Sequence, residues 1–82
     1  MATLLERATA LAVADEPPPA DAVAKLWEDL AVAPPEEAAD PCTVLVLAGL
    51  QRRVVVGGAI VRALARVNPV LVARKKAREG AY

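Results

Sequence analysis

The sequence predicts an all-α fold, a small bundle of four or five short helices. Three observations favour it. Apolar residues recur at helical spacing in several segments, prolines and Asx residues mark helix starts between those segments, and the apolar side chains are mainly Ala, Val and Leu, with no Phe. A chain of 82 residues is long enough for one domain only, so we predict a single helical domain over residues 1–82.

A capping box predicts the first helix. In Thr3-Leu4-Leu5-Glu6 the hydroxyl can accept a hydrogen bond from the backbone N–H three residues later, and the carboxylate can reach back. The helix should end near Ala14, because two acidic residues and three consecutive prolines follow it. Residues 15–19 are therefore expected to form a stiff, proline-rich connector.

The next segment has the clearest amphipathic pattern. Between about Ala20 and Val32, apolar side chains follow the i, i+3, i+4, i+7 spacing of a helix, namely Val23, Leu26, Trp27 and Leu30. This stripe has two interpretations, because it could fill the core or dock into a groove of a partner protein. A lone tryptophan is typical of both settings. We take the four residues as candidate partner-binding residues and expect Trp27 mainly in the core.

Residues 42–56 have two structural interpretations. Pro35-Glu36-Glu37 and Asp40-Pro41 each have the composition of a helix start, which favours a buried helix in this region. The β-branched runs Thr43–Leu47 and Arg53–Val56 would instead fit a β-hairpin. The segment between these runs lacks an Asn-Gly or Asp-Gly pair, so we favour the helix and keep the hairpin as the alternative.

Two helices are expected in the C-terminal part. Gly57-Gly58 predicts a bend, and a helix should follow over residues 59–67. Asn68-Pro69 should stop this helix and start the next, because Asn is a good cap and Pro suits the first helical position. The last helix should run from Pro69 to about Glu79.

Charge is divided unevenly although the total is zero. Residues 1–41 hold nine acidic and two basic side chains, a net charge of −7, and residues 42–82 hold eight basic and one acidic side chain, a net charge of +7. The two halves could fold against each other, copies could pair head to tail, or the basic half could contact phosphates of a nucleic acid. The candidate basic patch consists of Arg62, Arg66, Arg74, Lys75, Lys76 and Arg78.

The residue types missing from the chain argue against catalysis. Without His or Ser, the sequence excludes Ser-His-Asp sites, Cys-His sites and the usual zinc sites. Cys42 is the single cysteine and is expected to be a buried apolar side chain rather than a reactive thiol. Glu36 and Asp40 fit an acidic helix start better than a metal site. We predict a protein that is not an enzyme, with no catalytic residue, cofactor, metal or small-molecule substrate.

The same features predict where the protein works. No apolar run approaches the ~20 residues of a membrane span, and the apolar stretch before Ala12-Val13-Ala14 is interrupted by charges, unlike a signal peptide. With a lone cysteine, this predicts an intracellular, cytoplasmic protein that does not contact a membrane. Because an Ala/Val core is thin, we expect the chain to complete its burial on neighbouring protein chains, as a structural assembly subunit such as a virion component. The alternative function is nucleic-acid binding through the basic helices.

Overall fold

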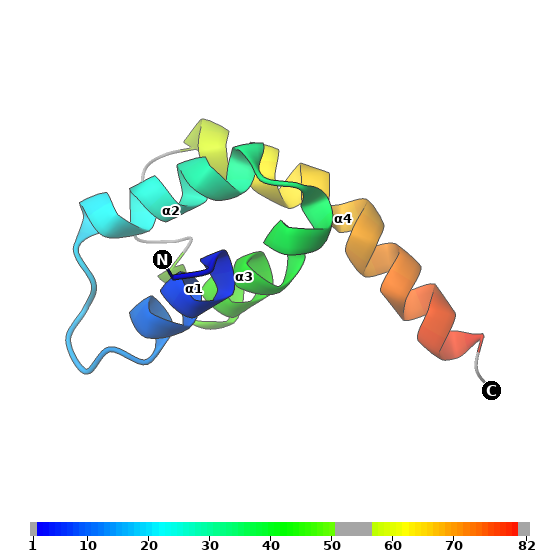
Figure 1. The fold of residues 1–82 in the computed structure, drawn as a ribbon, viewed down its shortest axis with the longest axis horizontal. Helices are drawn as coiled ribbons and strands as arrows, with labels where there is room; N and C mark the ends of the chain where they lie inside the picture. The colour runs from blue at the N-terminus through cyan, green and yellow to red at the C-terminus, as the bar shows by residue number, and fades with distance from the viewer. Residues whose placement is uncertain (1, 51–56, 81–82) are drawn as a thin grey trace.

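The all-α prediction is confirmed. A computed structural model describes residues 2–50 and 57–80, and within these ranges the chain forms four helices and no strand (Figure 1). In chain order they are α1 (Leu4–Ala12), α2 (Ala20–Val32), α3 (Pro35–Leu47) and α4 (Gly57–Glu79). Helix α1 packs on α3, and both α2 and α3 pack on α4.

The first two helices lie close to where the sequence predicts them. The Thr3 hydroxyl accepts a hydrogen bond from the backbone N–H of Glu6 at 3.1 Å, which is the N-cap bond of the predicted capping box. Helix α2 has the predicted bounds, Ala20–Val32. Prolines precede α2 and prevent the helix from starting earlier. Between α2 and α3 the backbone of Pro34 is extended, so a short break separates the two helices.

Helix α3 overturns the β-hairpin alternative for residues 42–56. The run Thr43–Leu47, which would be the first strand, is the second half of α3. The run Arg53–Val56, which would be the second strand, lies outside the described residues. The segment is helical because its apolar residues fall at helical spacing toward the core, where Cys42 and Leu45 are buried.

Two prolines stand inside helices, where the sequence predicts helix starts. At Pro41 the helix continues, although the carbonyl of Glu37 loses its usual N–H partner. At Pro69 the predicted break is wrong, because α4 is one helix from Gly57 to Glu79. Pro69 is exposed, so water can reach the backbone around the missing hydrogen bond.

The core forms around Trp27, which is fully buried. All four helices contribute to it, and its largest fully buried side chains include Trp27, Leu26, Leu30 and Leu45. Ala8, Ala39 and Ala63 are also completely buried, so small side chains allow α1, α3 and α4 to come close to their neighbours. No charged side chain is buried in the described part of the chain.

Replacing Trp27 by Ala should lower the free energy of unfolding by about 3–5 kcal/mol, because it removes the largest buried side chain and leaves a cavity. The matched control is Val32→Ala, since Val32 is 75% exposed, and its effect should stay within about 0.5 kcal/mol. Urea unfolding followed by circular dichroism measures both. Equal losses in the two variants would contradict the central position of Trp27.

Candidate interaction surfaces

The four residues predicted to bind a partner lie in the core. Val23, Leu26, Trp27 and Leu30 are between 0 and 1% exposed. Other helices of the same chain cover them, so in this fold none of them presents a surface to another protein. The indole N–H of Trp27 has no hydrogen-bond partner among the described residues, and such an unpaired buried donor costs about 1–3 kcal/mol.

The six residues of the predicted basic patch are exposed on α4, but they do not share one side of it. Successive residues of a helix are about 100° apart. Arg62, Arg66 and Lys76 therefore point to one side of α4, whereas Arg74 and Arg78 point to another. The guanidinium of Arg66 donates to the carbonyl of Ala31 near the end of α2, so this residue joins two helices.

The C-terminal part of α4 extends away from the other helices (Figure 1). The side of α4 that faces the core carries Ala63 and Val67, which are buried, and seven residues after Val67 the same side carries Arg74. A charged side chain is costly to bury without a partner, so the core ends before this point. Residues 71–80 are all exposed, and we call them the arm.

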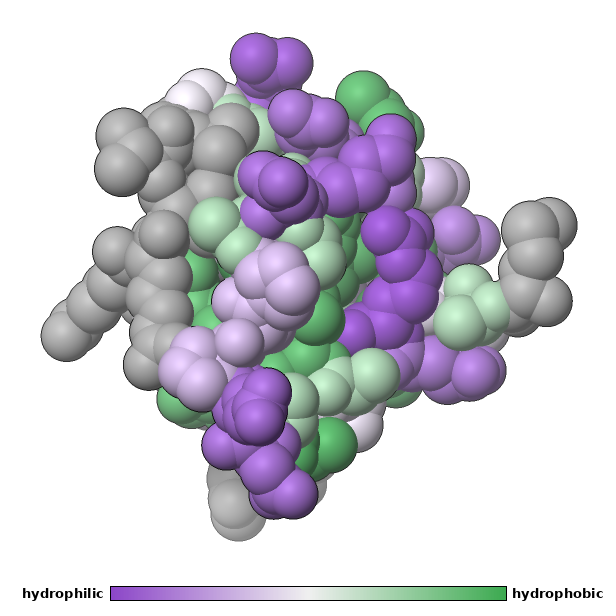
Figure 2. Space-filling model, turned by 90° about the vertical axis from the view of Figure 1, so that its left-hand side faces the viewer, coloured by the Kyte–Doolittle hydropathy of each residue, from purple (hydrophilic) through white to green (hydrophobic). Residues whose placement is uncertain are grey.

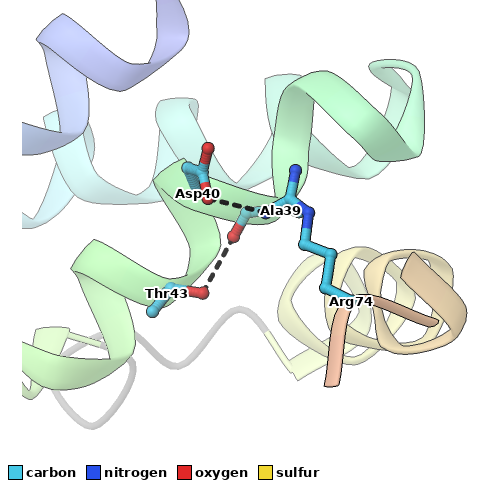
Figure 3. Close-up of polar contacts among 4 residues, drawn as sticks. All are labelled: Ala39, Asp40, Thr43 and Arg74. Carbon is cyan, nitrogen blue, oxygen red and sulfur yellow. Dashed lines mark hydrogen bonds and ion pairs between the residues drawn. The ribbon is translucent and has the colours of Figure 1, made fainter. Parts of the chain in front are cut away.

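A salt bridge joins the arm to α3. Nη1 of Arg74 lies 2.8 Å from Oδ1 of Asp40 (Figure 3). In the same part of α3 the hydroxyl of Thr43 donates to the carbonyl of Ala39. The side chains of Arg74 and Asp40 are 44% and 60% exposed, so water screens their attraction.

Within the described residues, the Asp40–Arg74 pair is the only salt bridge that connects the acidic half of the sequence to the basic half. The other salt bridges lie within one half and are Arg7–Asp29, Lys25–Asp29 and Lys75–Glu79. The described ion pairs therefore neutralise little of the charge difference between the two halves.

Three carboxylates border a cleft between the start of α1 and the first half of α3. The cleft has a volume of about 590 Å³ and is lined by Ala2, Thr3, Leu4, Leu5, Glu36, Glu37, Asp40 and Pro41. Glu36 and Glu37 lie in the first turn of α3, where negative charge is favourable. We call this hollow the acidic cleft. No group of three His, Cys, Asp or Glu side chains in the described ranges is placed to hold a metal ion.

An apolar groove lies between α3 and α4. It has a volume of about 350 Å³ and is lined by Cys42, Thr43, Val46, Leu47, Leu64 and Leu71. Leu47 and Leu71 are exposed. Val61 and Val72, which lie on the adjoining side of α4, are exposed as well. Neighbouring exposed apolar side chains of this size are typical of a surface that another molecule covers.

Apolar surface is also exposed at the end of the bundle that holds the connection between α1 and α2. Figure 2 faces this end and shows hydrophobic surface between bands of hydrophilic side chains. A hollow of about 410 Å³ in the described structure is lined by Arg7, Ala10, Leu11, Ala22, Lys25 and Leu26. The exposed apolar surface is thus spread over more than one side of the molecule.

Burial raises the pKa of the Cys42 thiol to about 11. The thiol stays protonated at neutral pH, and a protonated thiol is a poor nucleophile. Cys42 is buried at the base of the apolar groove. Its environment is that of the small apolar side chain expected from the sequence.

No helix among the described residues is long and apolar enough to cross a membrane. Comparisons of the chain with models of protein families, with curated proteins and with solved structures found no match.

The salt bridge between α1 and α2 should stabilise the fold less at acid pH. Arg7 donates to Asp29 across 2.9 Å, and this bond holds the pKa of the Asp29 carboxyl below its usual range, with Lys25 adding to the effect. Because the pKa of this carboxyl is lower in the folded state, the ionised carboxylate stabilises the fold at pH values above the pKa of an unfolded Asp, about 3.9. This stabilisation is lost as the pH falls through the pKa of the folded state.

Asp29→Asn should therefore flatten the fall in stability below about pH 4, and Glu28→Gln, a change at an exposed neighbour, should not. Urea unfolding between neutral and acid pH measures this difference. Identical acid profiles for wild type and Asp29→Asn would contradict the effect of Arg7 on Asp29.

Proposed function

We propose that this protein is a non-enzymatic structural subunit that packs on neighbouring protein chains and is oriented on them by its acidic and basic surfaces. The observation that carries the proposal is the combination of the apolar groove with two surfaces of opposite charge, the acidic cleft and the arm. An apolar surface rewards contact with another chain, and complementary charges fix its orientation.

The small core supports this proposal. Among the described residues Trp27 is the one aromatic side chain in the core, and many of the other buried positions are Ala or Val. A domain of this size buries only about 60–65% of the surface that its unfolded chain exposes. Leu47 and Val61 remain exposed although larger apolar side chains are scarce, so covering them on a neighbouring chain would add to the stability.

The proposal includes an intracellular, cytoplasmic setting, or a large particle assembled there such as a virion. This setting rests on the lone buried Cys42. The absence of His and Ser from the sequence argues against most acid-base and nucleophilic chemistry and supports the non-enzymatic role. A structural subunit in an assembly needs neither a cofactor nor a substrate.

A nucleic-acid-binding function is the second candidate, and the exposed basic side chains of the arm favour it. They are Arg74, Lys75, Lys76 and Arg78. Phosphate contacts need only positive charge near the backbone. The division of these side chains between different sides of α4 disfavours a groove-reading helix, and no aromatic side chain of the described arm could stack on bases.

Size-exclusion chromatography with light scattering should find the chain in assemblies at low ionic strength and as smaller species at high ionic strength, because salt screens the charges that orient the contacts. The same samples, titrated with duplex DNA, test the second candidate. If four arm charges contact phosphates, the logarithm of the binding constant should fall with a slope of roughly −3 to −4 against the logarithm of salt concentration. A monomer with such steep DNA binding would overturn the assembly proposal.

A further inference from the structure

We propose that the arm of one copy docks in the acidic cleft of a second copy, so that copies of this chain join head to tail. The inference rests on the proposed function, and it names the partner and the two surfaces that meet.

The charges of the two surfaces match. The arm holds four basic side chains and one acidic one, a net charge of +3, and the acidic cleft holds three carboxylates. Pairing α4 with α4 of a second copy would instead bring together two helices that each hold six basic side chains and one acidic one. Like charges repel, so the surface that suits the arm is the acidic cleft.

The apolar parts of the two surfaces match as well. Leu71, Lys75 and Arg78 follow i, i+4, i+7 spacing, so one side of the arm carries an apolar side chain followed by two cations. The acidic cleft offers the complementary set, because Leu4 and Leu5 line it beside the carboxylates. Leu5 is exposed in this structure, and a docked leucine would cover it.

The salt bridge within one copy leaves both surfaces available. Arg74 and Asp40 pair at the base of the arm, and an exposed pair of this kind contributes only about 0–1 kcal/mol. Among the described ion pairs, none involves Glu36 or Glu37 of the cleft, or Lys76 or Arg78 of the arm. The arm extends away from the other helices of its own copy, so its basic end is accessible to another molecule (Figure 1).

This contact joins two different surfaces, so it is not a two-fold contact. Each copy that docks its arm still offers its own acidic cleft to the next copy. A contact of this type closes into a ring or continues as a filament, depending on the rotation between copies.

The experiment is sedimentation velocity of the full chain at low ionic strength, with paired charge reversals. Glu36→Lys with Glu37→Lys changes the cleft, and Lys75→Glu with Arg78→Glu changes the docking side of the arm. The matched control is Asp21→Lys with Glu28→Lys, which makes the same change of net charge as the cleft variant at exposed positions of α2. Circular dichroism checks that each variant is folded, and Glu36→Gln with Glu37→Gln replaces the cleft variant if lysines at the helix start unfold it.

The cleft and arm variants should each sediment mainly as monomers, whereas the control should assemble like the wild type. Mixing the cleft variant with the arm variant should restore association, because the intact arm of the first fits the intact cleft of the second. Assembly that survives both reversals, or is lost equally in the control, would overturn this inference and leave the proposed function standing. A wild-type chain that is monomeric at every ionic strength would overturn both.

Discussion

Burial of the apolar stripe of α2 around Trp27 is the interaction on which the rest of the fold depends. Trp27 is the largest buried side chain, and the core cluster to which it belongs includes the small buried residues Ala8, Ala39 and Ala63 of α1, α3 and α4. The sequence contains no Phe, and the buried apolar residues in ranges 2–50 and 57–80 form one core cluster. The helices are therefore arranged to cover one tryptophan, and apolar side chains that do not reach it, such as Leu47 and Val61, stay at the surface.

Local signals in the sequence predict a helix correctly where each signal has a single structural interpretation. The bounds of α2 follow from its apolar spacing and the prolines before and after it, and the start of α1 follows from the Thr3 cap. Pro41 and Pro69 lead to wrong predictions of helix starts. Proline suits the first helical turn, but it is also tolerated inside a helix that packs on other helices. Only tertiary packing distinguishes these cases, since Cys42 and Leu45 are drawn into the core after Pro41.

The candidate surfaces are harder to predict than the helices. The spacing of Val23 and Trp27 fits both a core and an interface, and only the covering helices decide for the core. The basic residues can be counted in the sequence, but nothing local indicates that Arg66 would bond to the end of α2. The acidic cleft forms where the starts of α1 and α3 meet, more than 30 residues apart in the chain, although the acidic first turn of α3 is visible in the sequence.

The central claim is that folding leaves this chain with apolar and charged surface that is best covered by another chain, so that stability and association are linked. The most direct test is the midpoint of thermal unfolding of the wild-type chain, measured over a wide range of protein concentrations at low ionic strength. Association of folded chains makes the midpoint rise with concentration, and we expect this rise to disappear at high salt. A midpoint that is independent of protein concentration at low ionic strength would contradict the account.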